Sequence, residues 1–408
     1  MKLLEIKRTE GPEIIEEGLY ESDKGKRYSV YFCTQDRVSQ ARHSHHFFIV
    51  GLVAAFLRGE TYTHPDPVDP ILIENMQALM AVWGQWRGRK PVKIKGPTLS
   101  ALEDERPEAK IAALLSGGVD SLFTAQTRAS EVDVFVNILH SDGEVSQHKC
   151  GEDSSNLKPF AKARSKDLIT VDTNMMYAFP EISDAWATLA HGACYAAVGH
   201  FLSHDLSRLL ISSSFTIEQQ RPWGSHPDTD YLLSSSGLEV EHVGIRTNRF
   251  EKHREIAKDK LNLKHLSVCE HGPQSGAHLN CSTCQKCLRS MIAIDLLQIP
   301  QHRAATFDWS DYRPDKLKAF LLPGHVNCSE MLEEADKIGR EDISAALYDV
   351  IKYSQKYNWL VRLELFLRRR FRPAVRYKAQ LKRLRGAAYS LMNIKTRKVE
   401  QKTNNYGD

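Results

Sequence analysis

The segment Ile111-Ala-Ala-Leu-Leu-Ser-Gly-Gly-Val-Asp-Ser121 joins a short apolar run to a glycine turn, and a helical pattern follows it. An unbroken apolar run of this length is typical of a strand that is buried on both faces of a parallel sheet. A strand that turns through two glycines into a helix brings backbone N–H groups to the positive end of the helix dipole. The segment therefore predicts a strand, an anion-binding turn and a helix in direct succession.

Similar apolar runs recur along the middle of the chain and alternate with helix-like stretches such as Ala185–Leu202. The expected strands span residues 132–139, 168–171, 209–212 and 240–243. Strands that alternate with helices at this spacing predict an α/β domain with a doubly wound parallel sheet. We assign this domain to residues 106–300.

The flanking regions have a different character. Residues 1–105 contain a β-leaning run at Tyr28–Cys33, an apolar helical run at Phe47–Leu57 and a periodic segment at Ile71–Trp86, so we expect an N-terminal α+β region of unknown role. Residues 301–408 predict a helical C-terminal region. Within it, residues 361–408 carry a net charge of +11, which leaves −7 for the rest of the chain. Such a basic tail favours nucleic acid, a membrane surface or the acidic body of the chain itself as its partner.

The glycine turn supplies the candidate nucleotide-binding residues. A polyphosphate is the natural occupant of a helix start of this kind, and a carboxylate at the turn could help to hold the accompanying Mg²⁺ because hard cations prefer oxygen ligands. The alternative is an ordinary strand–helix turn without a ligand. The candidate binding residues are Ser116, Gly117, Gly118, Val119, Asp120 and Ser121, and Asp120 and Ser121 are also the candidate catalytic residues.

Four of the eight cysteines fall within a short stretch, at Cys269, Cys281, Cys284 and Cys287. Four thiolates suit a closed tetrahedral Zn²⁺ site, and the two-residue gaps suit a loop that wraps a metal. An iron–sulfur cluster can use the same four ligands, and His271 or His278 could replace one cysteine. The preferred interpretation is a structural zinc site that anchors the helix expected at Leu288–Leu297.

The two motifs resemble a known family. Ser116–Ser121 is similar to the S-G-G-x-D-S loop of the N-type ATP pyrophosphatases, and the cysteine spacing followed by Leu288 and Arg289 resembles the zinc site of the 7-cyano-7-deazaguanine synthases. The resemblance covers roughly residues 108–300 and implies an adenine nucleotide alpha hydrolase-like fold. It also implies cleavage of ATP to AMP and pyrophosphate, with adenylation of a carboxylate or amide that ammonia or an amine then attacks. We expect this acceptor group to belong to a small molecule or to a protein partner.

Other polar groups follow the expected strands. Ser212–Phe215 and Ile138–Asp142 lie where an open α/β sheet places its ligands, although a self-satisfied turn would explain the serines equally well. His226, Asp228 and Asp230 fit either substrate contact or a solvated turn. A final group, Arg246, Arg249 and Lys252, could face the phosphates or form a charged helix start.

Composition limits the remaining possibilities. The longest apolar run is too short to cross a bilayer, and the first residues lack a signal-peptide pattern, so we expect a cytoplasmic protein without a membrane span. Two further functions remain open: a tRNA-modifying ATP pyrophosphatase that uses the basic tail, and a nucleotide-binding scaffold without turnover.

Overall fold

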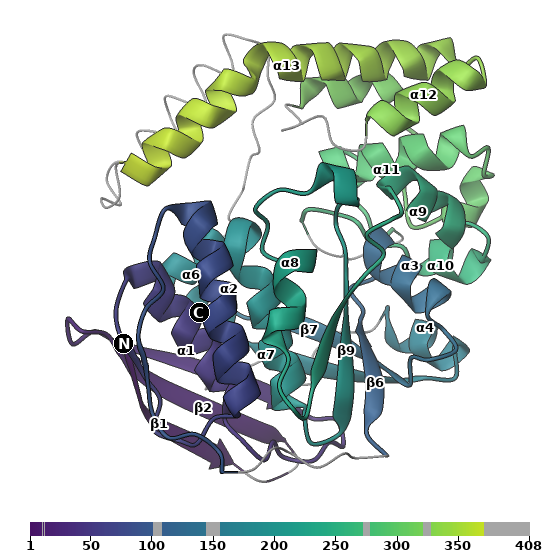
Figure 1. The fold of residues 1–408 in the computed structure, drawn as a ribbon. Coiled ribbons are helices and arrows are strands. Elements are labelled where there is room, and N and C mark those ends of the chain that lie inside the picture. Colours follow the sequence, from purple (N-terminus) through teal and green to yellow (C-terminus); the bar gives the residue numbers. More distant parts are fainter. Residues whose placement is uncertain are drawn as a thin grey trace, which may run out of the picture. The chain divides into compact units, whose positions relative to one another are not determined.

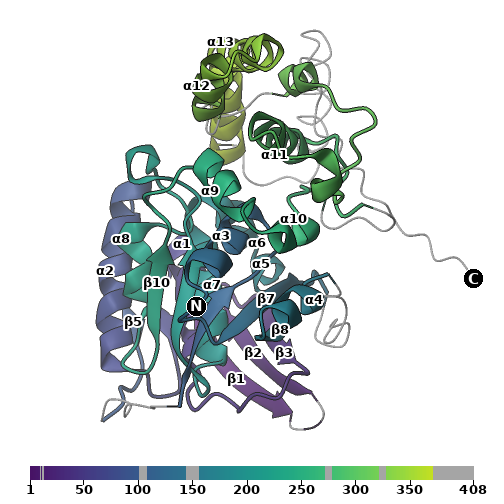
Figure 2. The ribbon, with the colours of Figure 1, turned by 90° about the vertical axis from the view of Figure 1, so that its right-hand side faces the viewer.

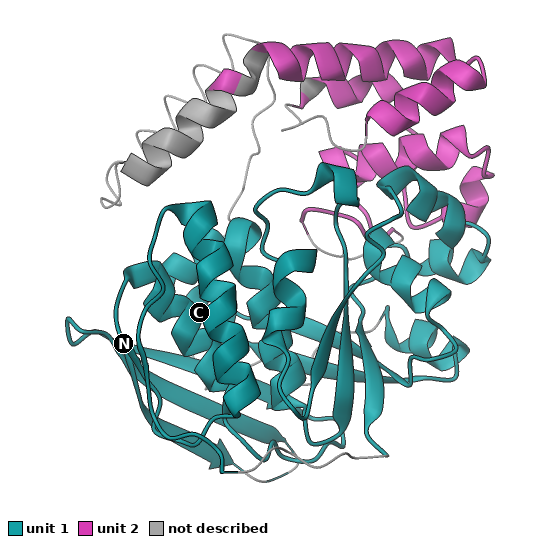
Figure 3. Ribbon diagram, viewed as in Figure 1, with its two compact units in different colours: residues 1–267 teal, residues 268–408 magenta. Residues whose placement is uncertain are grey.

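The computed structural model describes residues 1–9, 11, 13–100, 108–143, 156–271, 278–320 and 328–370. These residues form two compact units, residues 1–267 and residues 268–408, which Figure 3 colours separately. The division differs from the expected ranges 1–105, 106–300 and 301–408. Its physical reason is that the N-terminal strands are hydrogen-bonded into the same sheet as the central ones.

The first unit is built on one mixed sheet (Figure 1). Its parallel part confirms the predicted α/β class and reproduces the expected strands with small shifts at their ends. The parallel strands lie in the order β10 (Glu239–Val243), β9 (Leu206–Ser212), β6 (Lys110–Leu114), β7 (Val134–His140) and β8 (Asp167–Thr173).

The N-terminal strands extend this sheet beyond β8. Strand β3 (Arg27–Thr34) pairs antiparallel with β8 through Phe32 and Cys33, and β2 (Ile14–Glu21) and β1 (Lys2–Thr9) follow it. The short strands β4 (Tyr62–Thr63) and β5 (Ile94–Lys95) complete the edge. The expected α+β region therefore shares the sheet and its core with the central parallel strands.

Helices cover both faces of the sheet (Figure 2). On one face, α1 (His45–Arg58), α2 (Pro70–Arg87) and α7 (His191–Phe201) share a single apolar cluster with Ala112, Val134 and Val136. On the other face, Phe135 contacts Phe160 of α4 (Lys158–Ala163). Since neighbouring strand residues point to opposite faces, both layers follow from the alternation of Val134, Phe135 and Val136.

The remaining elements of the first unit connect these layers. Helix α3 (Val119–Thr127) packs on α9 (Arg249–Ile256), and α10 (Lys260–His265) contacts α4. The connecting elements are α5 (Met175–Ala178), α6 (Pro180–Ala185), the π-helix η2 (Trp186–Ala190), the 3-10 helices η3 (Ile217–Gln219) and η4 (Tyr231–Leu233), and α8 (Pro227–Asp230).

The described part of the second unit is helical. Helix α11 (Gln285–Leu296) follows the cysteines as expected, and the 3-10 turns η5 (Gln301–Ala304) and η6 (Pro314–Ala319) lead to α12 (Ser329–Lys337) and α13 (Glu341–Arg370). The basic segment beyond Arg370 lies outside the described residues. Among the described helices, none combines the length and the apolar character that crossing a bilayer would require.

Candidate functional site: the loop at residues 116–121 and the cysteine group

The loop at residues 116–121 follows β6 at the carboxyl edge of the parallel strands. Gly117 has a φ of +75°, in the left-handed region that favours glycine. A Cβ there would lie 3.2 Å from Leu157 Cδ2 and 3.3 Å from the His265 carbonyl oxygen. The sharp turn delivers Gly118 as the N-cap of α3, so the first N–H groups of the helix face the space beyond the sheet edge.

The two serines of the loop have different roles. The Ser121 hydroxyl is buried, accepts a hydrogen bond from the Ser116 N–H at 3.2 Å and donates to the Gly118 carbonyl at 3.0 Å. Ser116 is exposed, and its Oγ lies 3.3 Å from Ser121 Oγ. Ser121 therefore holds the turn closed, whereas Ser116 presents its hydroxyl to the solvent side.

Asp120 is held by two cations from α9. Arg249 Nη2 donates to Asp120 Oδ2 at 2.6 Å, and Lys252 Nζ donates to Asp120 Oδ1 at 3.1 Å. Lys252 is 1% exposed and also donates to the Ser213 carbonyl at 2.6 Å. The structure thus brings together Asp120 and two of the three basic residues singled out in the sequence, while Arg246 is exposed.

The electrostatics of this group follow from its burial. Burial by itself would raise the pKa of Asp120, but the charges of Arg249 and Lys252 outweigh it, so the pKa of this carboxyl lies below its usual range. Burial lowers the pKa of Lys252 from its ordinary value, although the Asp120 charge opposes this shift. The carboxyl is therefore a carboxylate at neutral pH, paired with an excess of positive charge.

The serines at the end of β9 form hydrogen bonds within the protein. Ser212 Oγ lies 2.8 Å from Thr124 Oγ1 of α3, and the Ser213 hydroxyl donates to the Phe215 carbonyl at 2.6 Å. These contacts favour the structural interpretation of this stretch. Its contribution to the site is the Ser213 carbonyl, which fixes Lys252.

The predicted polar group after residue 225 divides into buried and exposed members. Asp230 is fully buried, accepts a hydrogen bond from Ser225 Oγ at 2.6 Å and lies 2.7 Å from His242 Nδ1. His226 is buried as well, whereas Asp228 is exposed. This network ties α8 to β10, which indicates a structural role.

The end of β7 is also tied into the fold. The Ser141 hydroxyl donates to Asp172 Oδ1 at 2.7 Å, and the Tyr31 hydroxyl donates to Asp172 Oδ2 at 3.1 Å. His140 differs from these groups because its buried Nδ1 has no hydrogen-bond partner among the described residues. Burial lowers the pKa of His140 to about 4, so this ring is neutral at pH 7.

An aromatic group that the sequence did not reveal surrounds His140. Trp186 lies 5.1 Å from the His140 ring and 5.9 Å from Tyr195, measured between ring centroids. Farther along, the Arg221 guanidinium lies 4.3 Å from the Phe215 ring centroid. These residues come from distant segments, and the only local sign, the π-helix that begins at Trp186, has no recognisable sequence signature.

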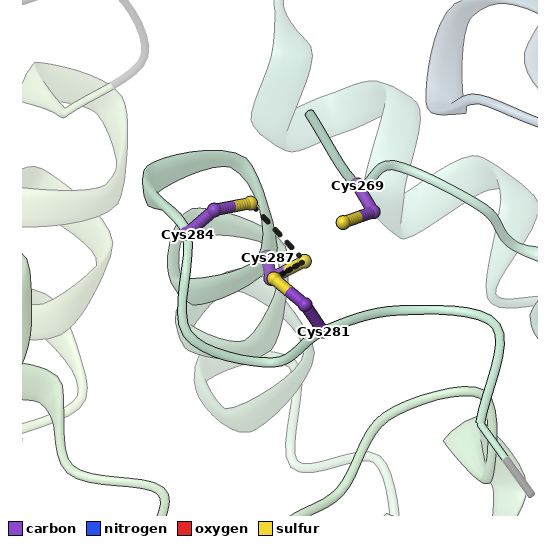
Figure 4. A group of neighbouring side chains, drawn as sticks. All are labelled: Cys269, Cys281, Cys284 and Cys287. Carbon is purple, nitrogen blue, oxygen red and sulfur yellow. Dashed lines mark hydrogen bonds between the residues drawn. The ribbon is translucent and has the colours of Figure 1, made fainter. Parts of the chain in front are cut away.

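The four cysteines converge in the second unit, as Figure 4 shows. Their sulfur atoms all lie within 4.8 Å of one another, with Cys284 Sγ 3.4 Å and Cys281 Sγ 3.9 Å from Cys287 Sγ. Tetrahedral ligands at the zinc–sulfur bond length of about 2.3 Å lie about 3.8 Å apart. The group is therefore compatible with a metal ion such as zinc, with Cys269 as the fourth ligand.

The surroundings of the sulfur atoms support this assignment. The hydrogen-bonded contact between the Cys284 and Cys287 sulfur atoms lowers the pKa of Cys284 and raises that of Cys287, and burial raises the pKa of Cys269. His278 Nδ1 is engaged by the Ala305 carbonyl at 2.9 Å, and the backbone N–H of His271 donates to Cys269 Sγ at 3.4 Å. The cysteines thus form the ligand group without either histidine ring.

No family model matches this chain, and searches of curated proteins and of solved structures find no match to it.

Proposed function

We propose that this protein is an ATP-dependent enzyme that cleaves ATP to AMP and pyrophosphate at the loop formed by residues 116–121 and adenylates a carboxylate or amide. The observation that carries the proposal is the left-handed Gly117 turn that delivers α3 to the carboxyl edge of the parallel strands. A nucleotide polyphosphate fits such a helix start because backbone N–H groups and the helix dipole both favour an anion.

Charged residues beside the loop suit the same chemistry. Asp120 would hold the Mg²⁺ that accompanies the triphosphate, and that ion would stabilise the charge that builds on the leaving pyrophosphate. Arg249 and Lys252, both beside Asp120, add positive charge at the same place. Adenylation of the acceptor requires no protein nucleophile, so a protein hydroxyl or thiol is not needed at the reacting atoms.

The acceptor would bind beside the loop, on the aromatic group around Trp186. Half-buried rings at Trp186, Tyr195 and Trp223 offer planar apolar surfaces, and the cationic side chain of Arg221 lies 5.5 Å from the Trp223 ring centroid. This combination suits a flat acid such as a deazapurine carboxylate, in agreement with the resemblance to 7-cyano-7-deazaguanine synthases. A neutral His140 could accept a proton from an attacking amine.

The proposed cofactors divide between the two units. ATP and Mg²⁺ would bind the loop in the first unit, and Zn²⁺ would bind Cys269, Cys281, Cys284 and Cys287 in the second unit as a structural ion. The fold we propose is the adenine nucleotide alpha hydrolase-like variant of the doubly wound sheet. Elemental analysis with an absorbance spectrum distinguishes zinc from an iron–sulfur cluster, since only the cluster absorbs in the visible range.

Product analysis tests the activity. The protein is incubated with ATP, Mg²⁺, ammonia and a set of small aromatic acids, and the nucleotides are separated by ion-exchange chromatography. We expect AMP and pyrophosphate from the wild type and none from Asp120→Ala, with the fold and metal content unchanged. Asp167→Ala is the matched control. This exposed carboxylate lies at the amino end of β8, whereas the loop lies at the carboxyl ends of the parallel strands.

Two results would contradict the proposal. Formation of ADP and phosphate would mean that a different bridge of the triphosphate is cleaved. Equal AMP formation by Asp120→Ala and the wild type would place the reaction away from the loop. Binding of ATP without any turnover would instead support the scaffold function.

A further inference from the structure

Two ion pairs share the Asp120 carboxylate, one with Arg249 and one with Lys252. These three residues are here called the ion triad. Its distances are 2.6 Å between Arg249 Nη2 and Asp120 Oδ2, and 3.1 Å between Lys252 Nζ and Asp120 Oδ1. Both carboxylate oxygens therefore already accept a strong hydrogen bond from a cation. A Mg²⁺ ion that needs Asp120 as a ligand has to compete with these two cations.

The two cations are fixed to different degrees. Lys252 is 1% exposed, and its ammonium is anchored by the Ser213 carbonyl at the carboxyl end of β9. Arg249 is 28% exposed, and its buried Nε has no hydrogen-bond partner among the described residues. Arg249 therefore has a free donor and room to turn, while Lys252 stays at the sheet edge.

The charge balance of the triad points to an anion. Two cations face a single carboxylate, so the triad carries one unit of excess positive charge in a largely desolvated place. A buried cation without full compensation is costly, and a phosphate oxygen would supply the missing negative charge. The excess lies directly beside the start of α3, where the helix dipole also favours an anion.

We infer that Arg249 and Lys252 are the phosphate-binding residues beside the loop. Until a magnesium–polyphosphate complex binds, the Asp120 carboxylate pairs with both cations in place of the phosphate oxygens. In the exchange, phosphate oxygens take over the two cations and Mg²⁺ takes over the carboxylate. Each of these groups keeps a partner of opposite charge, and the phosphate adds the negative charge that the triad lacks before binding. This inference rests on the proposed function, since it describes how the same loop admits its nucleotide.

The exchange gives Asp120 two opposite effects on binding. Without a metal ion, its carboxylate competes with phosphate for Arg249 and repels the incoming anion. With Mg²⁺ present, the same carboxylate holds the ion and so favours the complex. Removal of the Asp120 charge should therefore strengthen the binding of phosphate groups without metal, and it should reduce the extent to which Mg²⁺ increases their affinity.

Calorimetric titration with inorganic pyrophosphate, with and without Mg²⁺, tests the inference on the full chain. Without metal, we expect Asp120→Asn to bind pyrophosphate about tenfold more tightly than the wild type, which corresponds to one pKa unit of charge interaction. Arg249→Gln should bind about tenfold more weakly in both conditions. Arg254→Gln is the matched control on the same helix, since the exposed Arg254 pairs with Glu251, and the affinity of this variant should stay unchanged.

The inference is overturned if Asp120→Asn binds metal-free pyrophosphate no more tightly than the wild type, or if Arg249→Gln and Arg254→Gln behave alike. Melting temperatures of all variants establish that each one is folded before it is titrated. The result is separable from the proposed function. Tighter binding by Asp120→Asn together with a wild type that never forms AMP would leave the inference standing and remove the enzymatic activity.

Discussion

The protein has two candidate ligand sites, the loop at residues 116–121 and the cysteine group. The interactions that stabilise each site are different. The loop is closed by its own hydrogen bonds, such as those of the Ser121 hydroxyl, and its carboxylate is already neutralised by Arg249 and Lys252. The four cysteine sulfurs lie within 4.8 Å of one another, and thiolates at such distances repel one another unless a cation binds among them. Substitutions in the loop should therefore change binding more than stability, whereas loss of the metal should change stability first.

The largest effect should come from the metal. Cys287 is fully buried at the centre of the group, so Cys287→Ser, or removal of the metal with a chelator, should destabilise the second unit by more than about 3 kcal/mol. The measurement is zinc content together with a melting curve that reports on each unit. Cys328→Ala is the control, because this buried thiol lies in the same unit outside the group.

A wild-type melting curve for a Cys287→Ser variant that has lost its zinc would contradict this prediction. The metal would then contribute nothing to the stability of the second unit. Equal loss of zinc from Cys328→Ala would place the metal elsewhere.

Acid should affect the first unit through buried histidines. Burial lowers the pKa values of His64, His140 and His200 to about 4, below the ordinary value of about 6.5. Stability from keeping these rings neutral is complete above pH about 6.5 and is lost as the pH falls towards about 4, by up to about 1.4 kcal/mol per pH unit for each ring. The physical cause is that these histidines bind protons in the unfolded chain at a pH at which they are still neutral in the folded protein, so acid favours the unfolded state.

Urea unfolding at several pH values between about 7 and about 5 measures this slope. We expect a shallower slope for His200→Gln, because one titrating group is gone, and a wild-type slope for the exposed control His302→Gln. Added zinc should leave the slope unchanged, since these histidines lie in the first unit. Identical slopes for both variants and the wild type would rule out this source of acid sensitivity.

The smallest effect distinguishes the two loop glycines. Gly117→Ala should cost about 1–2 kcal/mol, since its left-handed φ is unfavourable for any residue with a Cβ. Gly118 has a φ of −77°, and a Cβ there would meet its nearest neighbour at an ordinary 3.4 Å, so Gly118→Ala should change stability by less than about 0.5 kcal/mol. Equal losses in urea unfolding would mean that the turn has a different backbone from the one described.

Local patterns in the sequence predicted the strands, the helices and the cysteine group, because these features depend on residues that are close together in the chain. The apolar run at Ile111–Leu115 and the helical period at Ile71–Trp86 correspond to β6 and α2 because burial on a sheet or a helix face imposes those periods. The cysteine group was predictable for a similar reason. Its four thiols are close in sequence, so spacing alone restricts how they can meet.

Long-range contacts could not be predicted in the same way. Strands β1 and β2 are rich in charged residues. Among the described strands, they reach the central sheet through β3, whose Phe32 and Cys33 pair with β8. The contact between Asp120 and Arg249 spans more than a hundred residues of chain and depends on how α9 packs on α3. Neither propensity nor periodicity carries information on such pairings.

We propose that the turn at residues 116–121 binds the triphosphate of a nucleotide, and a crystal structure with Mg²⁺ and a non-hydrolysable ATP analogue would show whether it does. We expect phosphate oxygens against the N–H groups at the start of α3, with Arg249 turned from Asp120 to the phosphates and the metal ion on the Asp120 carboxylate. A nucleotide bound elsewhere, with the turn empty and the ion triad intact, would show that residues 116–121 do not form the nucleotide site.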